Sequence, residues 1–131
     1  MKINGILNSE ISKVLSYMGH TDEICICDCG LSIPQNVKRI DLSLELGKPS
    51  FMEVLKSITK DMKIEKIILA TEIETFNNEI LNQVKDLLKD ISLEFVSHSE
   101  FKQRTQSSKC VIRTGEATPY ANIILVSGVI F

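Results

Sequence analysis

Hydrophobic residues along this chain repeat with two periods, and the two periods alternate. Near the N-terminus they recur every three to four residues, which predicts an amphipathic helix that Asn8 or Ser9 caps and Gly19 ends. The segment over 23–28, whose interior residues 24–27 are all apolar, then predicts a buried strand. A weaker strand is predicted over 38–44. The first third of the chain therefore has the order helix, strand, strand.

The same alternation continues to the C-terminus. Further strands are predicted over 66–70, 93–96, 109–113 and 122–126. Further helices are predicted after a capping box at 50–53, after Asn77 or Asn78, and over 99–105. Strands that alternate with helices predict an α/β fold, with three α/β/α layers and a mostly parallel or mixed central sheet.

Length, composition and charge narrow the class of protein. The chain has 131 residues, of which 44% are hydrophobic and 24% charged, so we expect a single domain over residues 1–131. The net charge of −2 comes from mixed acids and bases, so no basic surface for nucleic acid is expected. No apolar run is long enough to span a membrane, and the N-terminus does not resemble a signal peptide. A cytoplasmic location is therefore expected.

Three of the four cysteines alternate along the first predicted strand, at Cys25, Cys27 and Cys29. On a strand this spacing places all three on one face. Thiolates are good ligands for soft metals, but common zinc motifs leave two or more residues between cysteines, and neither histidine stands at ligand spacing. We therefore interpret the cysteines as small buried packing residues and predict no metal site. Disulfides are not expected in a reducing compartment.

The candidate chemistry centres on the only two histidines, His20 and His98. Histidine exchanges protons near neutral pH. Asp28 and His98 fall at the carboxyl ends of predicted strands, where ligands bind in α/β sheets. His20 instead precedes its strand, so a neighbouring subunit could supply one of these residues. The other polar candidates are Asp22, Lys102, Arg113, Glu116, Tyr120 and Asn122, and each also has an ordinary structural interpretation as a cap, core residue or solvated charge.

The apolar C-terminus, over 123–131, is expected to be core or subunit interface, because an exposed apolar tail is costly.

Several long blocks of this sequence, in one order, resemble the D-ribose pyranases, relatives of L-fucose mutarotase. The blocks are Gly5-Ile6-Leu7-Asn8-Ser9-Glu10, Gly19-His20-Thr21-Asp22, Asp28-x-Gly30-Leu31-x-Ile33-Pro34, Glu94-Phe95-Val96-Ser97-His98 and Ile112-Arg113-Thr114-Gly115-Glu116-Ala117-Thr118-Pro119-Tyr120-Ala121-Asn122. Two residues depart from the family's usual pattern, Cys29 in place of alanine and Ser32 in place of proline.

The resemblance implies an isomerase that interconverts the β-pyranose and β-furanose forms of D-ribose without a cofactor. It also implies a cytoplasmic, ring-shaped homo-oligomer, typically a decamer, with sites near subunit boundaries. Under this resemblance His20 is the proton donor, and the sugar is bound by Asp28, His98, Tyr120, Asn122 and the backbone of Ala121. Lys102 is a further candidate for a sugar contact.

Three alternatives stay open at this point. A non-catalytic sugar-binding module would use the same hydroxyl-binding residues but has little need of a titrating group such as His20. A mutarotase that acts on another sugar, such as L-fucose, would differ in the shape of its pocket. A thiol-metal protein using Cys25, Cys27 and Cys29 is the least favoured.

Overall fold

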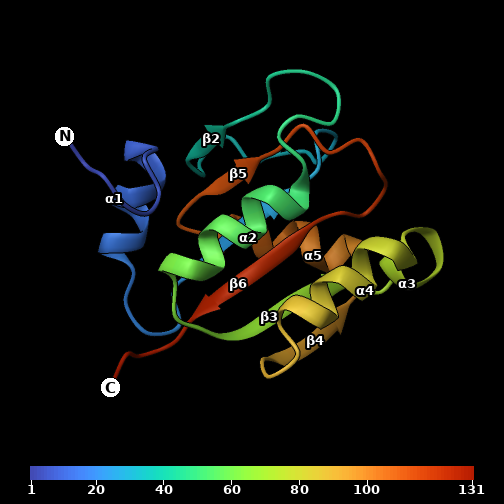
Figure 1. Ribbon diagram of the computed structural model, residues 1–131. Helices are drawn as coiled ribbons and strands as arrows, with labels where there is room; N and C mark the ends of the chain where they lie inside the picture. The colour runs from blue at the N-terminus through green and yellow to red at the C-terminus, as the bar shows by residue number, and fades with distance from the viewer.

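The computed structural model describes all 131 residues, and one six-stranded sheet forms its centre (Figure 1). The strands are β1 (Glu23–Cys27), β2 (Arg39–Asp41), β3 (Ile64–Ala70), β4 (Ser92–Val96), β5 (Val111–Arg113) and β6 (Ile123–Ser127), arranged in the order β2-β5-β1-β6-β3-β4. β6 runs antiparallel to both its neighbours, β1 and β3, and every other pairing is parallel. The expected α/β fold with a mostly parallel, mixed sheet is confirmed.

Helices cover both faces of this sheet. They are α1 (Ser9–Tyr17), α2 (Phe51–Asp61), α3 (Ile73–Phe76), α4 (Asn78–Leu87), α5 (His98–Arg104) and the short 3₁₀ helix η1 (Thr105–Ser107). Buried residues of α1, α2 and α4 share the larger core cluster, whereas Phe101 of α5 belongs to the smaller one on the other face. Figure 1 shows the same division, with α2 and α4 in front of the sheet and α5 behind it. The arrangement has the three layers that the sequence predicts.

Local capping explains where most helices begin. The side chain of Asn8 accepts a hydrogen bond from the backbone N–H of Ile11, and the predicted capping box between Ser50 and Glu53 is complete. Asn77 precedes α4 as predicted, but its side chain makes no capping bond. Its side-chain amide donates instead to Oγ1 of Thr118 and to the carbonyl oxygen of Pro119, each at 2.9 Å. A contact distant in sequence has therefore replaced the expected local one.

The observed elements refine the sequence-based expectations at three places. The helix α1 ends at Tyr17 with Met18 as its C-cap, so Gly19 directly follows the helix end as expected. The positive φ in this turn, 68°, belongs to Thr21 and not to Gly19. The strand predicted over 38–44 contains only Arg39–Asp41. Finally, α3 was not expected, because its single turn is too short to show a helical period.

The cysteines only partly follow the predicted alternation. Cys25 and Cys27 are fully buried in the smaller core cluster, on the α5 face of the sheet. Burial raises the pKa of the Cys27 thiol to about 12, which makes it an inert packing residue. Cys29 lies beyond the end of β1 and is partly exposed, so it does not share their strand face. No three His, Cys, Asp or Glu side chains gather closely enough to hold a metal ion.

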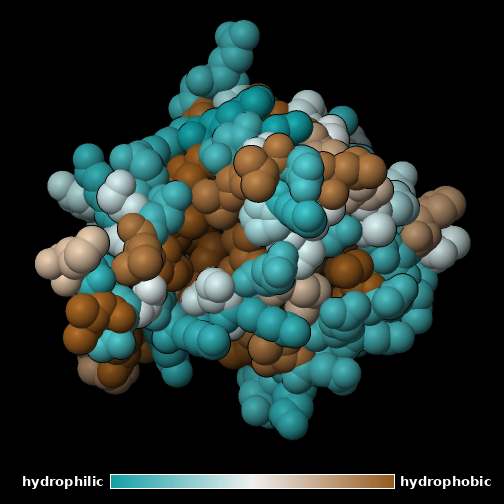
Figure 2. Space-filling model, turned by 45° about the horizontal axis from the view of Figure 1, so that its top comes forward, coloured by the Kyte–Doolittle hydropathy of each residue, from teal (hydrophilic) through white to brown (hydrophobic).

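Two apolar surfaces remain open on the single chain. One is a groove of about 930 Å³ lined by α1, α2 and nearby loops, and Figure 2 shows hydrophobic side chains gathered around a hollow in this face. The exposed side chains of Leu7, Leu44 and Leu46 belong to these segments and loops. The other is the C-terminal tail, where Ile130 and Phe131 are fully exposed. None of the helices has the length and apolar character needed to cross a membrane.

Candidate functional site

The predicted site residues lie at two opposite ends of the sheet. The carboxyl ends of β1, β3, β4 and β5 and the start of β6 share one end, here called the carboxyl edge. Asp28, His98 and the segment 120–122 are all found there. His20 lies at the other end, here called the amino edge, where β1 begins and β6 finishes. Figure 1 shows this antiparallel course of β6 through the middle of the sheet.

Asp28 and Asn122 are joined directly at the carboxyl edge. Asp28 follows β1 and Asn122 precedes β6, and the two strands are neighbours in the sheet. The backbone N–H of Asp28 donates to Oδ1 of Asn122 at 2.9 Å. The backbone N–H of Gly30 donates to Oδ1 of Asp28, also at 2.9 Å. The Asn122 side chain, which is 1% exposed, therefore holds the turn that carries the Asp28 carboxylate.

The Asp28 carboxyl has a raised pKa because burial penalises its charged form. Hydrogen bonds from Gly30, Asn122 and Leu31 and the nearby His98 ring lower the pKa in part, but burial has the larger effect. A partly desolvated carboxylate of this kind gains from hydrogen-bond donors such as sugar hydroxyls.

His98 and Tyr120 form the second part of the carboxyl edge. His98 is the first residue of α5, and its backbone N–H donates to Oε2 of Glu72 at 3.0 Å. Its ring meets Tyr120 edge-on, with the ring centroids 5.0 Å apart. The Nδ1 atom of His98 is buried and has no hydrogen-bond partner in the chain. Because buried polar atoms are nearly always paired, this nitrogen indicates a place where a ligand can bind.

The aromatic side of this cluster continues to Phe76, whose ring lies 5.6 Å from that of Tyr120. Tyr120 itself has a positive φ of 57°, a conformation that aims its ring into the cluster at a cost in backbone strain. Ala121 is fully buried beside it. Lys102 is exposed on α5. Its carbonyl oxygen accepts a hydrogen bond from the Thr105 hydroxyl at 2.6 Å, and its side chain has no hydrogen-bond or ion-pair partner within the chain.

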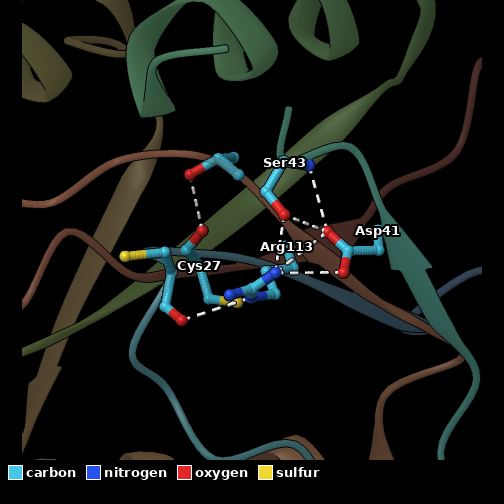
Figure 3. A network of polar contacts seen from close by, with 6 residues as sticks. Cys27, Asp41, Ser43 and Arg113 are labelled. Atoms are coloured by element: carbon cyan, nitrogen blue, oxygen red, sulfur yellow. Dashed lines mark hydrogen bonds and ion pairs between the residues drawn. The ribbon is translucent and has the colours of Figure 1, made fainter. Parts of the chain in front are cut away.

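Arg113, at the end of β5, ties the Asp28 turn to β2 (Figure 3). Its Nε–H donates to the carbonyl oxygen of Cys29 at 3.2 Å, and its Nη1 donates to Asp41 Oδ2 at 3.0 Å and to Ser43 Oγ at 2.6 Å. Hydrogen bonds from Ser43, and then from Arg113, lower the pKa of the Asp41 carboxyl. The guanidinium thus holds the backbone on which Asp28 is carried.

Glu116 supports the same turn from the other side. Its carbonyl oxygen accepts the backbone N–H of Cys29 at 2.9 Å, and its carboxylate accepts the N–H of Phe51 at the start of α2. The preceding Gly115 packs against the loop before α2 so closely that a Cβ would lie 2.4 Å from the carbonyl oxygen of Lys48. A pocket of about 270 Å³ opens between the Asp28 turn and residues 116–119.

His20 lies apart from this cluster, at the amino edge. Its side chain is 53% exposed, and its Nε2 is 2.9 Å from Oε2 of Glu65. The five residues of β1 stand between His20 and Asp28, a separation of at least ~13 Å along the strand. One chain therefore brings together Asp28, His98, Tyr120, Ala121 and Asn122 but leaves His20 at the opposite end of the sheet.

Sequence reasoning missed Glu72, Phe76 and Glu65. A signal for Glu72 existed, because it lies two residues beyond a predicted strand and hence near the carboxyl edge. Phe76 belongs to the unpredicted α3. Glu65 had no signal in the sequence, since it is one of many exposed acidic residues and its contact with His20 spans 45 positions.

Comparisons with known proteins agree along the whole chain. The model of the RbsD / FucU transport protein family matches residues 1–130. A D-ribose pyranase of Bacillus cytotoxicus is 58% identical over 131 residues, which is the full length of both chains. The structure of Bacillus subtilis RbsD complexed with D-ribose covers 100% of both chains at 47% identity, with a TM-score of 0.98.

A fucose mutarotase of Streptococcus pneumoniae, solved in complex with L-fucose, is 24% identical over 95% of each chain, with a TM-score of 0.80. At that identity the likeness extends to the fold alone.

Proposed function

We propose that this chain, which belongs to the RbsD / FucU transport protein family, is a D-ribose pyranase, an isomerase that interconverts the β-pyranose and β-furanose forms of D-ribose. The observation that carries the proposal is the 58% identity to a protein named D-ribose pyranase, without a gap in coverage of either chain. The likeness to the ribose-bound Bacillus subtilis structure, at a TM-score of 0.98, supports ribose as the sugar.

The carboxyl edge supplies the groups that would bind the sugar. The Asp28 carboxylate accepts hydrogen bonds from hydroxyls, and the unpaired Nδ1 of His98 has one hydrogen bond to offer. The rings of Tyr120 and Phe76 supply an apolar surface for the carbon–hydrogen face of the sugar. Buried Asn122 and the backbone of Ala121 complete the set. In this proposal Lys102 stays a candidate for an outer contact.

His20 is the proposed proton donor. As an imidazolium it gives a proton to the ring oxygen of the pyranose while the anomeric hydroxyl loses its proton to water. The bond from C1 to the ring oxygen then breaks, and the open aldehyde forms. The hydroxyl on C4 next attacks C1 and gives its proton to the neutral imidazole, while the carbonyl oxygen takes a proton from water. Each atom is balanced, and no electron leaves the sugar. General acid–base help of this kind contributes about 10²- to 10⁴-fold.

A second copy of the chain would supply His20 to the carboxyl edge. The proposal rests on the separation of at least ~13 Å within one chain, which no side chain spans. Exposed apolar surfaces at the α1–α2 groove and at Phe131 support association of copies. We propose a ring-shaped homo-oligomer, a decamer as the family resemblance implies, and a cytoplasmic location on the same ground.

Saturation-transfer NMR on ribose tests the function. Irradiating the β-pyranose anomeric signal should diminish the β-furanose signal much faster when the protein is present. A passive sugar-binding module would leave the exchange rate unchanged, and a mutarotase would speed only the exchange of α and β anomers. The same experiment on L-fucose measures sugar preference.

Mixing two impaired variants, assayed at a ribose concentration too low to saturate Asp28→Ala, tests whether the site is shared between copies. His20→Ala and Asp28→Ala chains, unfolded and refolded together, form oligomers in which some sites contain both native residues if these come from different copies. Exchange activity should then return to a sizeable fraction of the parent's. If both residues came from one chain, the mixture would stay as inactive as its components.

A further inference from the structure

At the amino edge, the carboxylate of Glu65 contacts the ring of His20, and none of the roles proposed above uses this contact. We propose that Glu65 is a positioning residue that holds the His20 ring with its proton on Nε2 and directs Nδ1 toward the sugar. The inference rests on the proposed function for its catalytic consequence, but the position of the proton on His20 is a property of the protein without sugar.

The backbone brings Glu65 to this place through an irregularity in β3. Ile64 pairs with Ser127 and Lys66 pairs with Val126, so two steps along β3 face one step along β6. Glu65 is the extra residue of this bulge and is free of the sheet ladder. Bulges re-aim side chains and occur often beside active sites. Here the extra residue projects a carboxylate to the loop that carries His20.

The neighbouring end of β6 leaves room for this carboxylate. A Cβ added at Gly128 would lie 3.1 Å from the Cβ of Glu65, closer than nearly all real contacts of that kind. The backbone N–H of Gly128 also donates to the carbonyl oxygen of Lys63 at 2.9 Å. The glycine therefore lets the end of β6 pack against the start of β3 without moving Glu65.

The loop that carries His20 is fixed by a strained backbone conformation and by hydrogen bonds. Thr21 has a φ of 68°, which is a true outlier for a β-branched residue and stores strain. Its N–H donates to the carbonyl oxygen of Ser127 at 2.9 Å, and the Asp22 carboxylate accepts the N–H of Gly19 at 2.9 Å. The strained residue directly follows His20, so the constraint falls on the residue that the mechanism uses.

The chemistry of the pair decides which nitrogen carries the proton. A carboxylate can only accept a hydrogen bond, so Nε2 must be the donor whenever the 2.9 Å contact is made. In the neutral ring Nδ1 is then the free acceptor, and in the imidazolium it is the donor. A ring with one defined acid–base nitrogen returns to the same state after each turnover. Ion pairs of this exposure, 53% and 40%, stabilise a fold only weakly, so the contact has little structural purpose.

The test compares Glu65→Gln and Glu65→Ala with the parent, with Glu79→Gln as the matched control on an exposed carboxylate that has no partner. A glutamine keeps the size but can either accept a hydrogen bond from Nε2 or donate one to it, so it no longer fixes which nitrogen carries the proton. Misplaced reacting groups cost on the order of 10²-fold in rate, so we expect kcat for ribose exchange to fall about 10- to 100-fold in both variants. KM should change less than about twofold, because substrate binding does not use Glu65.

The second measurement, NMR of the histidine rings, does not depend on ribose exchange activity. The chain has only two histidines, so labelling their rings with ¹⁵N gives few signals, and His20→Ala identifies those of His20. When the His20 ring of the parent is neutral, we expect the proton on Nε2 and none on Nδ1. In Glu65→Gln we expect a mixture of the two tautomers or the opposite tautomer.

Each outcome has one meaning. A parent spectrum with the proton on Nδ1 overturns the inference even if the variants fail to fold, and so does a variant with the parent's kcat. A loss that appears only in KM or thermal stability also overturns it. A parent that exchanges no ribose refutes the proposed function, and the ¹⁵N spectrum still decides the state of His20.

Discussion

The two edges of the sheet are built in opposite ways. At the carboxyl edge, Asp28 and Asn122 are hydrogen-bonded to each other, and Arg113 and Glu116 hold the backbone of the next residue, Cys29. At the amino edge, His20 and Glu65 contact each other but are about half exposed. A fixed, enclosed set of polar groups suits recognition of a sugar, whereas an exposed histidine is free to meet a ligand held by another copy. Under the proposed function, sugar binding and proton transfer would therefore occupy separate parts of the chain.

Removing His20 should separate the two edges most clearly. His20→Ala should lower the pyranose–furanose exchange rate at least about 100-fold, because general acid–base catalysis contributes 10²- to 10⁴-fold. The fold should be unchanged, since the exposed ring packs against no core. Saturation transfer measures the rate, and titration calorimetry should give a ribose dissociation constant within a few-fold of the parent's. A variant that exchanges ribose at the parent's rate would remove His20 from the mechanism.

Removing the Asn122 side chain should have the opposite effect and weaken ribose binding. Asn122→Ala leaves the backbone N–H of Asp28 without its acceptor, at a cost of about 1–3 kcal/mol in unfolding free energy. We expect the ribose dissociation constant to rise about 10- to 100-fold, because about 1.4 kcal/mol corresponds to tenfold in affinity. Calorimetry with ribose and thermal unfolding are the measurements. An unchanged affinity would mean that the Asp28 turn does not face the sugar.

Arg113 offers a milder change at the same edge. Arg113→Met should raise the ribose dissociation constant about three- to tenfold, because it loosens the Cys29 carbonyl rather than a group that touches the sugar. Arg113→Lys is the matched control that keeps the charge but loses the forked geometry, and it should rescue binding only in part. If lysine restored full affinity, charge alone would account for the role of Arg113.

The smallest expected effects come from two aspartates of the carboxyl edge whose pKa values move in opposite directions. The pKa of Asp41 is lowered, so its contribution to stability is present above the usual aspartate value of about 3.9 and is lost as the pH falls through the lower folded value. The pKa of Asp28 is raised, so its contribution is present below about 3.9 and is lost as the pH rises through the higher folded value.

At neutral pH, therefore, Asp41→Asn should lower the melting temperature and Asp28→Asn should raise it, while Asp28→Asn weakens ribose binding. The difference between Asp41→Asn and the parent should shrink as the pH falls below about 3.9. Melting curves across pH 3–7 check both signs. Equal shifts in the two variants would show that burial of Asp28 has no energetic cost.

The order of the elements could be predicted because its signals are local. The side chains of Asn8 and Ser50 cap helices within three residues of themselves, and the strand periods lie within short windows. The same rules placed Asp28 and His98 at strand ends and put His20 before its strand. Their roles in ribose chemistry remain predictions from the family resemblance and from the geometry described above.

What could not be predicted depends on contacts distant in sequence. Asparagine is a residue type that commonly caps helices, but the side chain of Asn77 donates to Thr118 and Pro119, more than 40 positions away. Glu65 reaches His20 only because β3 has a bulge opposite β6. A bulge depends on how two strands pair, so it cannot be predicted from the sequence of one strand. The sequence predicted that Cys25 and Cys27 share one face of a strand. It did not show that β1 ends at Cys27, so that Cys29 lies outside the strand.

The antiparallel course of β6 limits which insertions and deletions the chain can accept during evolution. Its first residues adjoin Asn122, among the groups proposed to bind the sugar, and its last adjoin Gly128 beside Glu65 and His20. Because a strand alternates its faces at every residue, one inserted or deleted residue within β6 would turn the side chains on one side of the change to the wrong face. Length changes within 122–128 should therefore abolish activity in descendants of this gene.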